Sequence, residues 1–406
     1  MNARPPKETR DPVLRKKARH LPPGLRSRSM HAMSARAAQG RFALQVCADC
    51  GTATYPPREA CPQCWGTLDW QDQPNGAQVL CETTVRVSTD LYFRDHLPWK
   101  MGKVALDAGP VALVHLHRSL RPDDRAVIRC MLDRGGNAAL FALPLHTSGD
   151  IDMTDPQLRE FVVPIKGKTV LVSDARSAIG LAVVKAMHDA GAALVVAGMA
   201  PPDRPLGDGA QILSLDGVQQ MPLDISDQTS VSEALSKVGG PLDIVINTAR
   251  HVRSGGVSAH GNLVEQRRAF DISAMGLSRL AQAAGPMLAG RSHGAFVDLI
   301  SSDALSGSAS HAGFAAAEAA RLALLQSFRH EMRGAGVRVM SVFTGPVEDE
   351  HFQSVPPPKV APRRIAGAIV DALTQGREQT CVGDIAQDAM DRWLEDPALY
   401  AREKNL

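Results

Sequence analysis

Alternating hydrophobic and polar positions in the first third of the chain predict a small β-barrel. Five short runs alternate in this way, and Gly, Pro and Asp turns separate them. They cover residues 78–87, 103–107, 111–117, 126–130 and 139–142. Because strands of this pattern bury one face each, several of them at short spacing are typical of a closed barrel.

Beyond residue 165 the pattern changes to strands and helices in alternation. Hydrophobic runs that predict buried strands cover residues 168–173, 193–197, 242–247, 295–300 and 337–343. Segments with helical spacing lie between them, the first at about residues 178–190. This order predicts a doubly wound parallel sheet of the Rossmann type.

Four cysteines ahead of the predicted barrel form two Cys-x-x-Cys pairs, which are Cys47 with Cys50 and Cys61 with Cys64. Two such pairs can complete a closed tetrahedral site that leaves no position for a substrate. The spacing therefore predicts a structural zinc ion that helps to fold a small, loop-rich ribbon. The alternatives are two disulfides, a redox dithiol or four unrelated thiols. Disulfides would require an oxidising compartment, and the sequence shows no secretory signal.

The composition is that of a globular protein with nearly balanced charge. Lys and Arg number 45 and Asp and Glu number 43, which gives a formal net charge of +2, and aromatic residues make up only 4%. A nucleic-acid partner is not expected, because such partners require a basic surface and exposed aromatic residues. No apolar run is long enough to span a membrane, so we expect a cytoplasmic protein without a membrane partner. Basic residues concentrate in residues 1–41, which we interpret as a solvated arm.

Residues 30–145 resemble the DUF35 family, in which a rubredoxin-like zinc ribbon is joined to an OB fold. The resemblance rests on a basic lead-in ending in Gly40-Arg41-Phe42, the two cysteine pairs with Pro56-Pro57-Arg58 between them, Pro98-Trp99, and Phe141-Ala142-Leu143-Pro144. It implies a non-catalytic subunit that assembles with a thiolase-like or aldolase-like protein. A CoA thioester would then be a ligand that both subunits share.

Residues 164–385 resemble the short-chain dehydrogenase/reductase family in the order of their motifs. The matching segments are Ser173 to Gly180 at the cofactor turn, Leu223-Asp224-Ile225 at the adenine-contacting Asp, Asn247-Thr248-Ala249-Arg250 at the Asn-Asn-Ala-Gly element, Ser301-Ser302 at the catalytic serine strand and Thr344-Gly345-Pro346-Val347 at the Pro-Gly corner. The resemblance implies a homodimer through this domain. It also implies NAD(P) contacts from Ser173, Arg176, Ile179, Gly180, Asp224 and Asn247.

Most residues that transfer hydride in that family are replaced in this chain. The reaction needs a tyrosine whose pKa is lowered by a lysine four residues on, together with a serine and an asparagine. The Tyr and Lys positions hold Phe314 and Glu318, and the Asn position holds Asp271. Only the serine is kept, as Ser302 or its neighbour Ser301. Phenylalanine has no proton to give, so the resemblance implies a degenerate tetrad without an assigned catalytic residue.

The cofactor turn is altered as well. Asp174 and Ala178 replace two of the three glycines that let the backbone approach a pyrophosphate. Asp174 would place a carboxylate near the phosphates, and Arg176 could offset its charge. Gly198-Met199, after the second strand, indicates no preference between NAD and NADP. These changes weaken the case for NAD(P) without removing it.

Together these patterns predict a multidomain chain of a zinc ribbon, an OB-fold barrel and a Rossmann-like α/β domain. The predicted parts are a basic helical or disordered lead-in (1–41), the ribbon (42–68), the barrel (69–148), a linker (149–165), the Rossmann-like domain (166–385) and a tail (386–406). The function expected first is an accessory or scaffold subunit of an acyl-CoA thiolase or aldolase complex, with a pseudo-dehydrogenase domain. The alternative is an active NAD(P)-dependent oxidoreductase that reduces a 3-ketoacyl-CoA or a related ketone.

Overall fold

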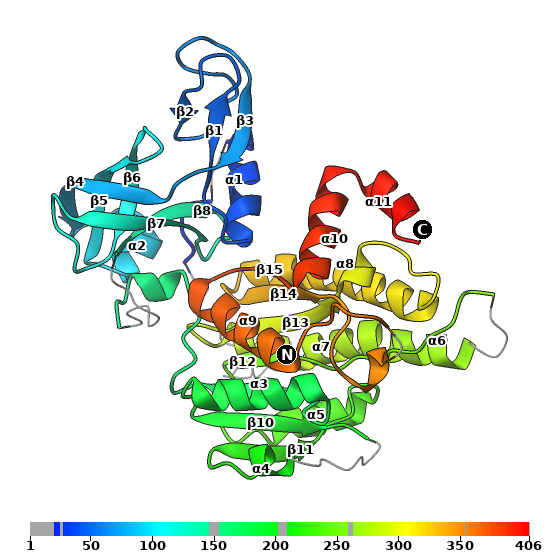
Figure 1. Cartoon of the computed structure of the whole chain (residues 1–406). Helices are drawn as coiled ribbons and strands as arrows, with labels where there is room; N and C mark the ends of the chain where they lie inside the picture. The colour runs from blue at the N-terminus through cyan, green and yellow to red at the C-terminus, as the bar shows by residue number, and fades with distance from the viewer. Residues whose placement is uncertain are drawn as a thin grey trace, which may run out of the picture.

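The computed structural model of the chain describes residues 20–24, 27–145, 154–201, 209–258, 263–353 and 355–405. Residues 1–19 of the predicted lead-in and 149–153 of the predicted linker lie outside these ranges. The ribbon and the barrel lie on one side of a larger α/β part (Figure 1). No helix in the described ranges is long and apolar enough to cross a membrane.

The N-terminal part begins with a helix, α1 (Arg28–Ala38), and continues into a three-stranded antiparallel sheet. The strands are β1 (Ala43–Cys47), β2 (Ala53–Thr54) and β3 (Leu68–Asp72), in the order β2-β1-β3. Met33 and Ala37 of α1 are buried in the barrel core together with Phe42 and Leu44. The ribbon is therefore anchored to the barrel through apolar contacts at its base.

Five strands, joined in antiparallel and parallel pairs, close into a barrel in the order β4-β5-β6-β8-β7. They are β4 (Gly76–Val85), β5 (Trp99–Leu106), β6 (Val111–Leu116), β7 (Arg125–Leu132) and β8 (Ala138–Pro144), with the short helix α2 (Leu91–Asp95) between β4 and β5. The predicted alternation of hydrophobic and polar positions matches which side chains face the inside of the barrel. On β6, Ala112, Val114 and Leu116 are buried, whereas Val111 and Leu113 are exposed. A five-stranded Greek-key barrel of this kind is an OB fold.

The C-terminal part is a seven-stranded parallel sheet in the order β11-β10-β9-β12-β13-β14-β15. The strands are β9 (Thr169–Val172), β10 (Leu194–Met199), β11 (Val218–Pro222), β12 (Ile244–Asn247), β13 (Ala295–Ser301), β14 (Arg338–Thr344) and β15 (Gln379–Val382). This architecture confirms the predicted fold class. The two outer strands, β11 and β15, were not among the predicted ones, because an edge strand carries polar residues such as Gln219 and Gln379.

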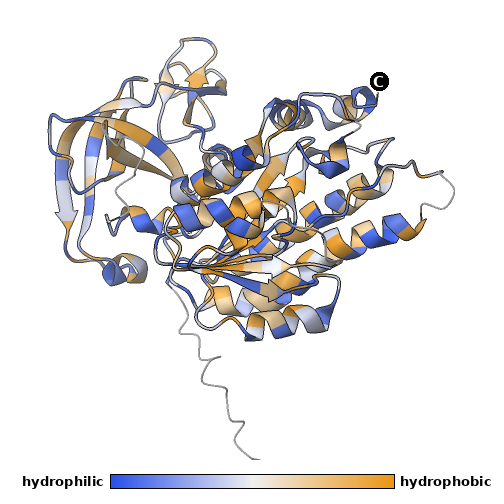
Figure 2. Ribbon diagram, turned by 60° about the horizontal axis from the view of Figure 1, so that its bottom comes forward, coloured by the Kyte–Doolittle hydropathy of each residue, from blue (hydrophilic) through white to orange (hydrophobic). Residues whose placement is uncertain are grey.

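Helices cover both faces of this sheet and bury its strands. They are α3 (Ala178–Asp189), α4 (Gly209–Leu213), α5 (Gln228–Ser236), α6 (Leu263–Phe270), α7 (Gly276–Ala289), α8 (Ala312–Arg333) and α9 (Pro362–Gln375), and α10 (Asp384–Glu395) and α11 (Pro397–Glu403) follow β15. The short turns are η2 (Leu158–Glu160), η3 (Asp271–Met275), η4 (Ser302–Ala304) and η5 (Glu350–Phe352). Hydrophobic residues gather along the strands and on the helix faces that cover them (Figure 2). Every residue of β13 and β14 is buried, as expected for central parallel strands.

Buried polar contacts attach the barrel to the parallel sheet. Arg338 at the start of β14 donates from Nη2 to the carbonyl oxygens of Leu132 and Glu160, both at 3.0 Å. Arg134 donates from Nε to Glu160 Oε2 at 3.0 Å and from Nη1 to the carbonyl oxygen of Gly336 at 3.3 Å. These hydrogen bonds join the last barrel turns and η2 to the start of β14.

Candidate functional site

The four paired cysteines meet at one point of the ribbon, where their sulfur atoms all lie within 4.8 Å of one another. Cys47 Sγ lies 3.4 Å from Cys64 Sγ, and Cys50 Sγ lies 3.7 Å from Cys61 Sγ. A tetrahedral zinc ion with Zn–S bonds of about 2.3 Å requires sulfur–sulfur separations of about 3.8 Å. All four thiols are free of disulfide bonds. The donor set therefore fits a structural zinc ion, and the four cysteines would hold it.

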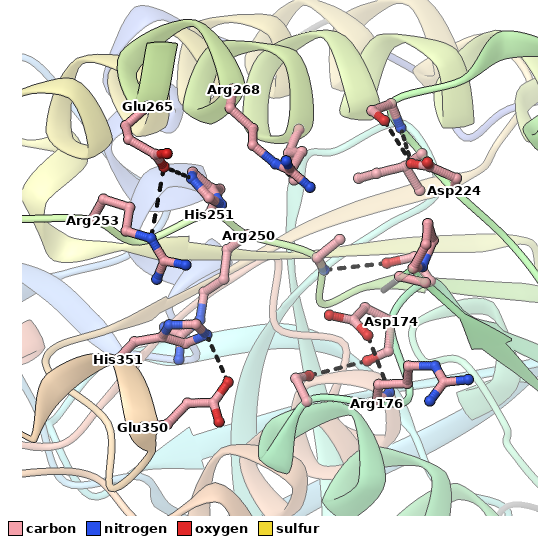
Figure 3. A pocket seen from close by; sticks show the side chains of 18 residues that line it. Asp174, Arg176, Asp224, Arg250, His251, Arg253, Glu265, Arg268, Glu350 and His351 are labelled. Atoms are coloured by element: carbon pink, nitrogen blue, oxygen red, sulfur yellow. Dashed lines mark hydrogen bonds and ion pairs between the residues drawn. The ribbon is translucent and has the colours of Figure 1, made fainter. Parts of the chain in front are cut away.

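A second candidate site lies at the carboxyl ends of the central strands of the parallel sheet. The strand order reverses direction between β9 and β12, and ligands of such sheets bind in the crevice at this point. A cavity of about 280 Å³, the nucleotide cleft, opens there (Figure 3). Its described lining includes Ser173, Asp174 and Arg176 after β9, Asp224 after β11, and Arg250 after β12.

The turn between β9 and α3 is tight and carries its own carboxylate. A Cβ atom at Gly180 would lie 1.8 Å from the carbonyl oxygen of Asp174, so only glycine allows this approach. The Ser177 hydroxyl caps α3 by accepting from the backbone N–H of Gly180 at 3.0 Å. Asp174 Oδ1 accepts from the backbone N–H of Arg176 at 3.1 Å. This carboxylate thus adds a negative charge to the turn that precedes α3.

Three of the six residues predicted to contact NAD(P) line the cleft, and three serve the packing around it. Ser173, Arg176 and Asp224 are among the lining residues. Ile179 is buried in the core, Gly180 permits the tight turn, and Asn247 connects strands. The Asn247 side chain accepts from Ser173 Oγ at 2.7 Å and donates to Asp298 Oδ1 at 2.8 Å.

None of the residues at the degenerate tetrad is among the described lining residues of the cleft. Phe314 and Glu318 are each only 1% exposed. Ser302 is buried in η4. Asp271 lies at the start of η3, where its Oδ1 accepts from Arg279 Nη2 at 2.7 Å.

Glu318 belongs to a buried ion network that the sequence motifs did not reveal. Its Oε2 accepts from the backbone N–H of Ser301 at 2.8 Å, and its Oε1 lies 3.4 Å from Arg321 Nη1. The Arg321 guanidinium also donates to both carboxylate oxygens of Asp298, at 2.6 and 2.8 Å. Burial alone would lower the pKa of Arg321, but the two carboxylates raise it above its ordinary value.

A second buried ion pair joins the segments that follow β12 and β14. Arg250 Nη2 lies 2.5 Å from Asp349 Oδ2, and the two side chains are 6% and 7% exposed. The Arg250 guanidinium carbon lies 5.5 Å from the centroid of the Phe352 ring. The centroid of the His311 ring lies 6.1 Å from that of Phe352. Arg250 replaces the glycine of the Asn-Asn-Ala-Gly element. This replacement was the sequence feature that could have indicated the ion pair. Asp349, which lies 99 residues further along the chain, belongs to no motif that would have indicated this pairing.

Cationic side chains in the cleft are balanced by carboxylates. Figure 3 shows Arg268 reaching into the cleft from α6 and Arg253 beside Glu265. His251 Nε2 lies 2.7 Å from Glu265 Oε2, and Arg253 Nε lies 3.6 Å from the same oxygen. In the described lining, four arginines stand against four carboxylates, which are Arg176, Arg250, Arg253 and Arg268 against Asp174, Asp224, Glu265 and Glu350.

Two features of these residues differ from those of a typical dinucleotide site. A dinucleotide lies across the crevice with one half on each side of the switch point and its pyrophosphate at the helix N-terminus. Here the Asp174 carboxylate stands at the turn, and Arg250, which follows β12, is ion-paired to Asp349 and stacked on Phe352.

Comparison with protein-family models matches residues 168–359 to the short chain dehydrogenase family and residues 34–70 to the ChsH2 rubredoxin-like zinc ribbon domain. An uncharacterized oxidoreductase of Staphylococcus aureus strain USA300 is 30% identical over 214 residues, which are 51% of this chain and 91% of that protein. The chain belongs to the short-chain dehydrogenase family. The two matches also confirm the predicted fusion of a zinc ribbon with a dehydrogenase domain.

Solved structures of dehydrogenases resemble this domain. A short chain dehydrogenase from Burkholderia cenocepacia, determined in complex with NADP, is 28% identical and has a TM-score of 0.53, covering 59% of this chain and 98% of its own. A short-chain dehydrogenase from Streptomyces avermitilis is 22% identical with a TM-score of 0.52, covering 59% of this chain and 96% of its own. The second likeness shows the dehydrogenase fold alone.

Proposed function

We propose that this chain is a non-catalytic accessory subunit of a thiolase-like or aldolase-like enzyme that acts on acyl-CoA thioesters. In this proposal its dehydrogenase domain scaffolds the assembly and forms a homodimer. The zinc ribbon match and the barrel support the first part, because the resembled family joins these two modules in subunits of such enzymes. The replaced tetrad supports the second.

The observation that carries the proposal is the pair Phe314 and Glu318. Reduction of a ketone by hydride needs a group that delivers a proton to the oxygen. Phe314 has none, and the Glu318 carboxylate is held by the Ser301 N–H and by Arg321 in a site that is 1% exposed. Because this carboxylate is buried and ion-paired, it does not reach the cleft as a replacement acid.

Exposed apolar residues on the outer face of the barrel support a partner protein at that face. Val111 and Leu113 on β6 are 53% and 56% exposed, and Leu80 on β4 is 47% exposed. The two strands lie on either side of β5, so the three side chains belong to one three-stranded part of the barrel. Exposed apolar groups of this kind are typical of surfaces that bind another protein.

The helices α6 and α8 offer the surface for the proposed homodimer. Phe270 at the end of α6 is 40% exposed, Met275 in η3 is 50% exposed, and Leu324 on α8 is 38% exposed. Ala316, Ala319 and Ala323 are also exposed on α8, and such small side chains allow two helices to approach closely.

The test is co-purification of the full chain with the thiolase-like or aldolase-like proteins of its host, followed by an assay of carbon–carbon bond cleavage. We expect a stoichiometric complex, and Leu113→Asp should break it. Leu394→Asp is the matched control, because Leu394 is 52% exposed on α10, a helix that follows the last strand of the parallel sheet (Figure 1). A partner that is fully active without this chain would contradict the proposal.

The same preparation tests the alternative function, which the NADP complex of the Burkholderia relative favours. The isolated chain is mixed with NADH or NADPH and a 3-ketoacyl-CoA, and nicotinamide absorbance is followed. We expect no turnover. Turnover that disappears in Ser302→Ala would establish an active reductase instead.

A further inference from the structure

Three arginines from three parts of the chain meet where the ribbon, the barrel and the dehydrogenase domain join. Arg41 lies between α1 and β1, Arg129 lies on the outer face of β7, and Arg377 follows α9. They line a cavity of about 350 Å³, the arginine junction, and Arg41 and Arg377 also line a smaller cavity of about 120 Å³. The junction lies between the barrel and the end of α9 that leads to β15 (Figure 1). It exists only because the domains pack together.

Close packing brings these side chains to one place. A Cβ atom at Gly40, where φ is +74°, would lie 2.8 Å from Arg377 Nε, so the Arg377 side chain lies directly over this glycine. Met131, two residues after Arg129 on the same face of β7, lies close to Gly376. Burial lowers the pKa of Arg129, and the nearby charge of Arg377 lowers it further.

The positive charge of the junction is not balanced by the residues around it. Its described lining holds three arginines and one carboxylate, Asp72, so two positive charges remain. Asp72 already pairs with Arg41, whose Nη2 lies 2.9 Å from Asp72 Oδ2. Glu378, next to Arg377 in the chain, pairs instead with Arg329 at 3.1 Å. The nucleotide cleft, with four arginines and four carboxylates, has no such excess.

Arg129 also has an unused donor. Its Nη1 atom is buried, and no described residue accepts a hydrogen bond from it. A buried charged donor without an acceptor is costly, and a second cation nearby adds to the cost. An anion with several oxygen acceptors would remove both costs, because guanidinium groups bind phosphate oxygens through paired hydrogen bonds.

We propose that the arginine junction is a binding site for a phosphate-bearing small molecule, either a free polyphosphate or the phosphorylated end of CoA. Its size is that of small-ligand pockets, and amide side chains of Gln73, Asn75 and Gln375 supply further polar groups. The bound ligand would touch all three parts of the chain and hold them together. This site stands independently of the accessory role proposed above.

The test is isothermal titration of the full, zinc-loaded chain with sodium pyrophosphate and, separately, with CoA. Arg129→Gln and Arg377→Gln should each weaken binding by about tenfold or more, since each removes a charged hydrogen-bond donor. Arg363→Gln is the matched control, because it removes the same charge from an exposed position on α9 and should change affinity less than about twofold. Arg268→Gln controls for ligand bound in the nucleotide cleft.

Thermal unfolding separates a binding role of Arg129 from a structural one. Without ligand, Arg129→Gln should unfold at the wild-type temperature or above it, because the unpaired buried donor and the repulsion by Arg377 are relieved. With pyrophosphate or CoA, the unfolding temperature should rise in the wild type, in Arg363→Gln and in Arg268→Gln, but not in Arg129→Gln or Arg377→Gln.

The results with pyrophosphate and with CoA distinguish the two possible ligands and can overturn the proposal. Binding of pyrophosphate points to a free polyphosphate, and binding of CoA alone points to CoA as the source. The proposal is overturned if neither probe binds the wild type, or if Arg129→Gln and Arg377→Gln bind as the wild type does. It is also overturned if Arg268→Gln, rather than Arg129→Gln, removes the binding.

Discussion

Replacing Glu318 by lysine would restore the family's residue at this position, yet we expect it to destabilise the dehydrogenase domain. The substitution removes the acceptor of the Ser301 N–H and places a second cation beside Arg321, which is fully buried. Breaking a buried ion pair by changing one partner costs about 3–5 kcal/mol. For a domain of this size, about 1 kcal/mol lowers the unfolding temperature by roughly 2–4 °C. Glu318→Lys should therefore lower it by roughly 6–20 °C.

The assay is thermal unfolding followed by circular dichroism at pH 7.5, with Glu318→Gln as the control. Glutamine keeps an acceptor for the Ser301 N–H and loses only the charge, so its unfolding temperature should fall by less than half as much. The double variant Phe314→Tyr with Glu318→Lys should gain no hydride transfer, because Arg321 and the second buried ion pair remain. A Glu318→Lys protein that unfolds within about 2 °C of the wild type would refute the argument from the buried network.

Three further predictions concern the metal, the second buried ion pair and pH. Zinc analysis should find one ion per chain in the wild type, whereas Cys61→Ala should lose the ion and the order of the ribbon, as seen by proteolysis. Arg250→Gly removes the ion pair with Asp349 and should make binding of NADPH measurable by fluorescence, although without turnover. Burial lowers the pKa of His115 to about 4, and its Nδ1 accepts from Trp99 Nε1 at 2.9 Å. Stability should therefore be complete above about pH 6.5 and fall towards about pH 4, by up to about 1.4 kcal/mol per pH unit, as measured by urea unfolding.

Each of these predictions has a result that would contradict it. A Cys61→Ala protein with a full zinc content would remove the four-thiolate site. NADPH binding by the wild type that equals that of Arg250→Gly would show that the ion pair does not close the crevice. An unchanged pH dependence in His115→Gln, which keeps an acceptor for Trp99, would assign the acid sensitivity to other groups.

The alternation and the cysteine spacing predicted most of the fold, because both are local signals. The barrel strands bury every second residue, and the central parallel strands are continuous hydrophobic runs, so each pattern identifies its own architecture. The signals failed at the two edges of the parallel sheet. β11 reads Val218-Gln219-Gln220-Met221-Pro222, and such an edge strand lacks the periodicity of its neighbours. The helices α10 and α11 fell in or overlapped the segment predicted as a tail.

The candidate sites, too, could be predicted only as far as local sequence motifs define them. The motif positions of Phe314 and Glu318 could be found from spacing, but the reason that Glu318 is not a free acid is Arg321, and no motif includes that residue. The six predicted NAD(P) contacts and the tetrad positions stay predictions. Arg250 and Asp349 are 99 positions apart, and the arginine junction joins positions 41, 129 and 377. Contacts of this range depend on how whole domains pack, which no local pattern encodes.

The nucleotide cleft and the arginine junction differ in their charge balance. A dehydrogenase domain that binds a dinucleotide needs an open crevice on both sides of the switch point and donors for the pyrophosphate. Here an internal carboxylate, Asp174, lies in the turn before α3, and Arg250 after β12 is ion-paired to Asp349. The unbalanced cations lie instead at the junction with the ribbon and the barrel. The excess of positive charge thus lies where the domains meet, at the site that we propose for a phosphate-bearing ligand.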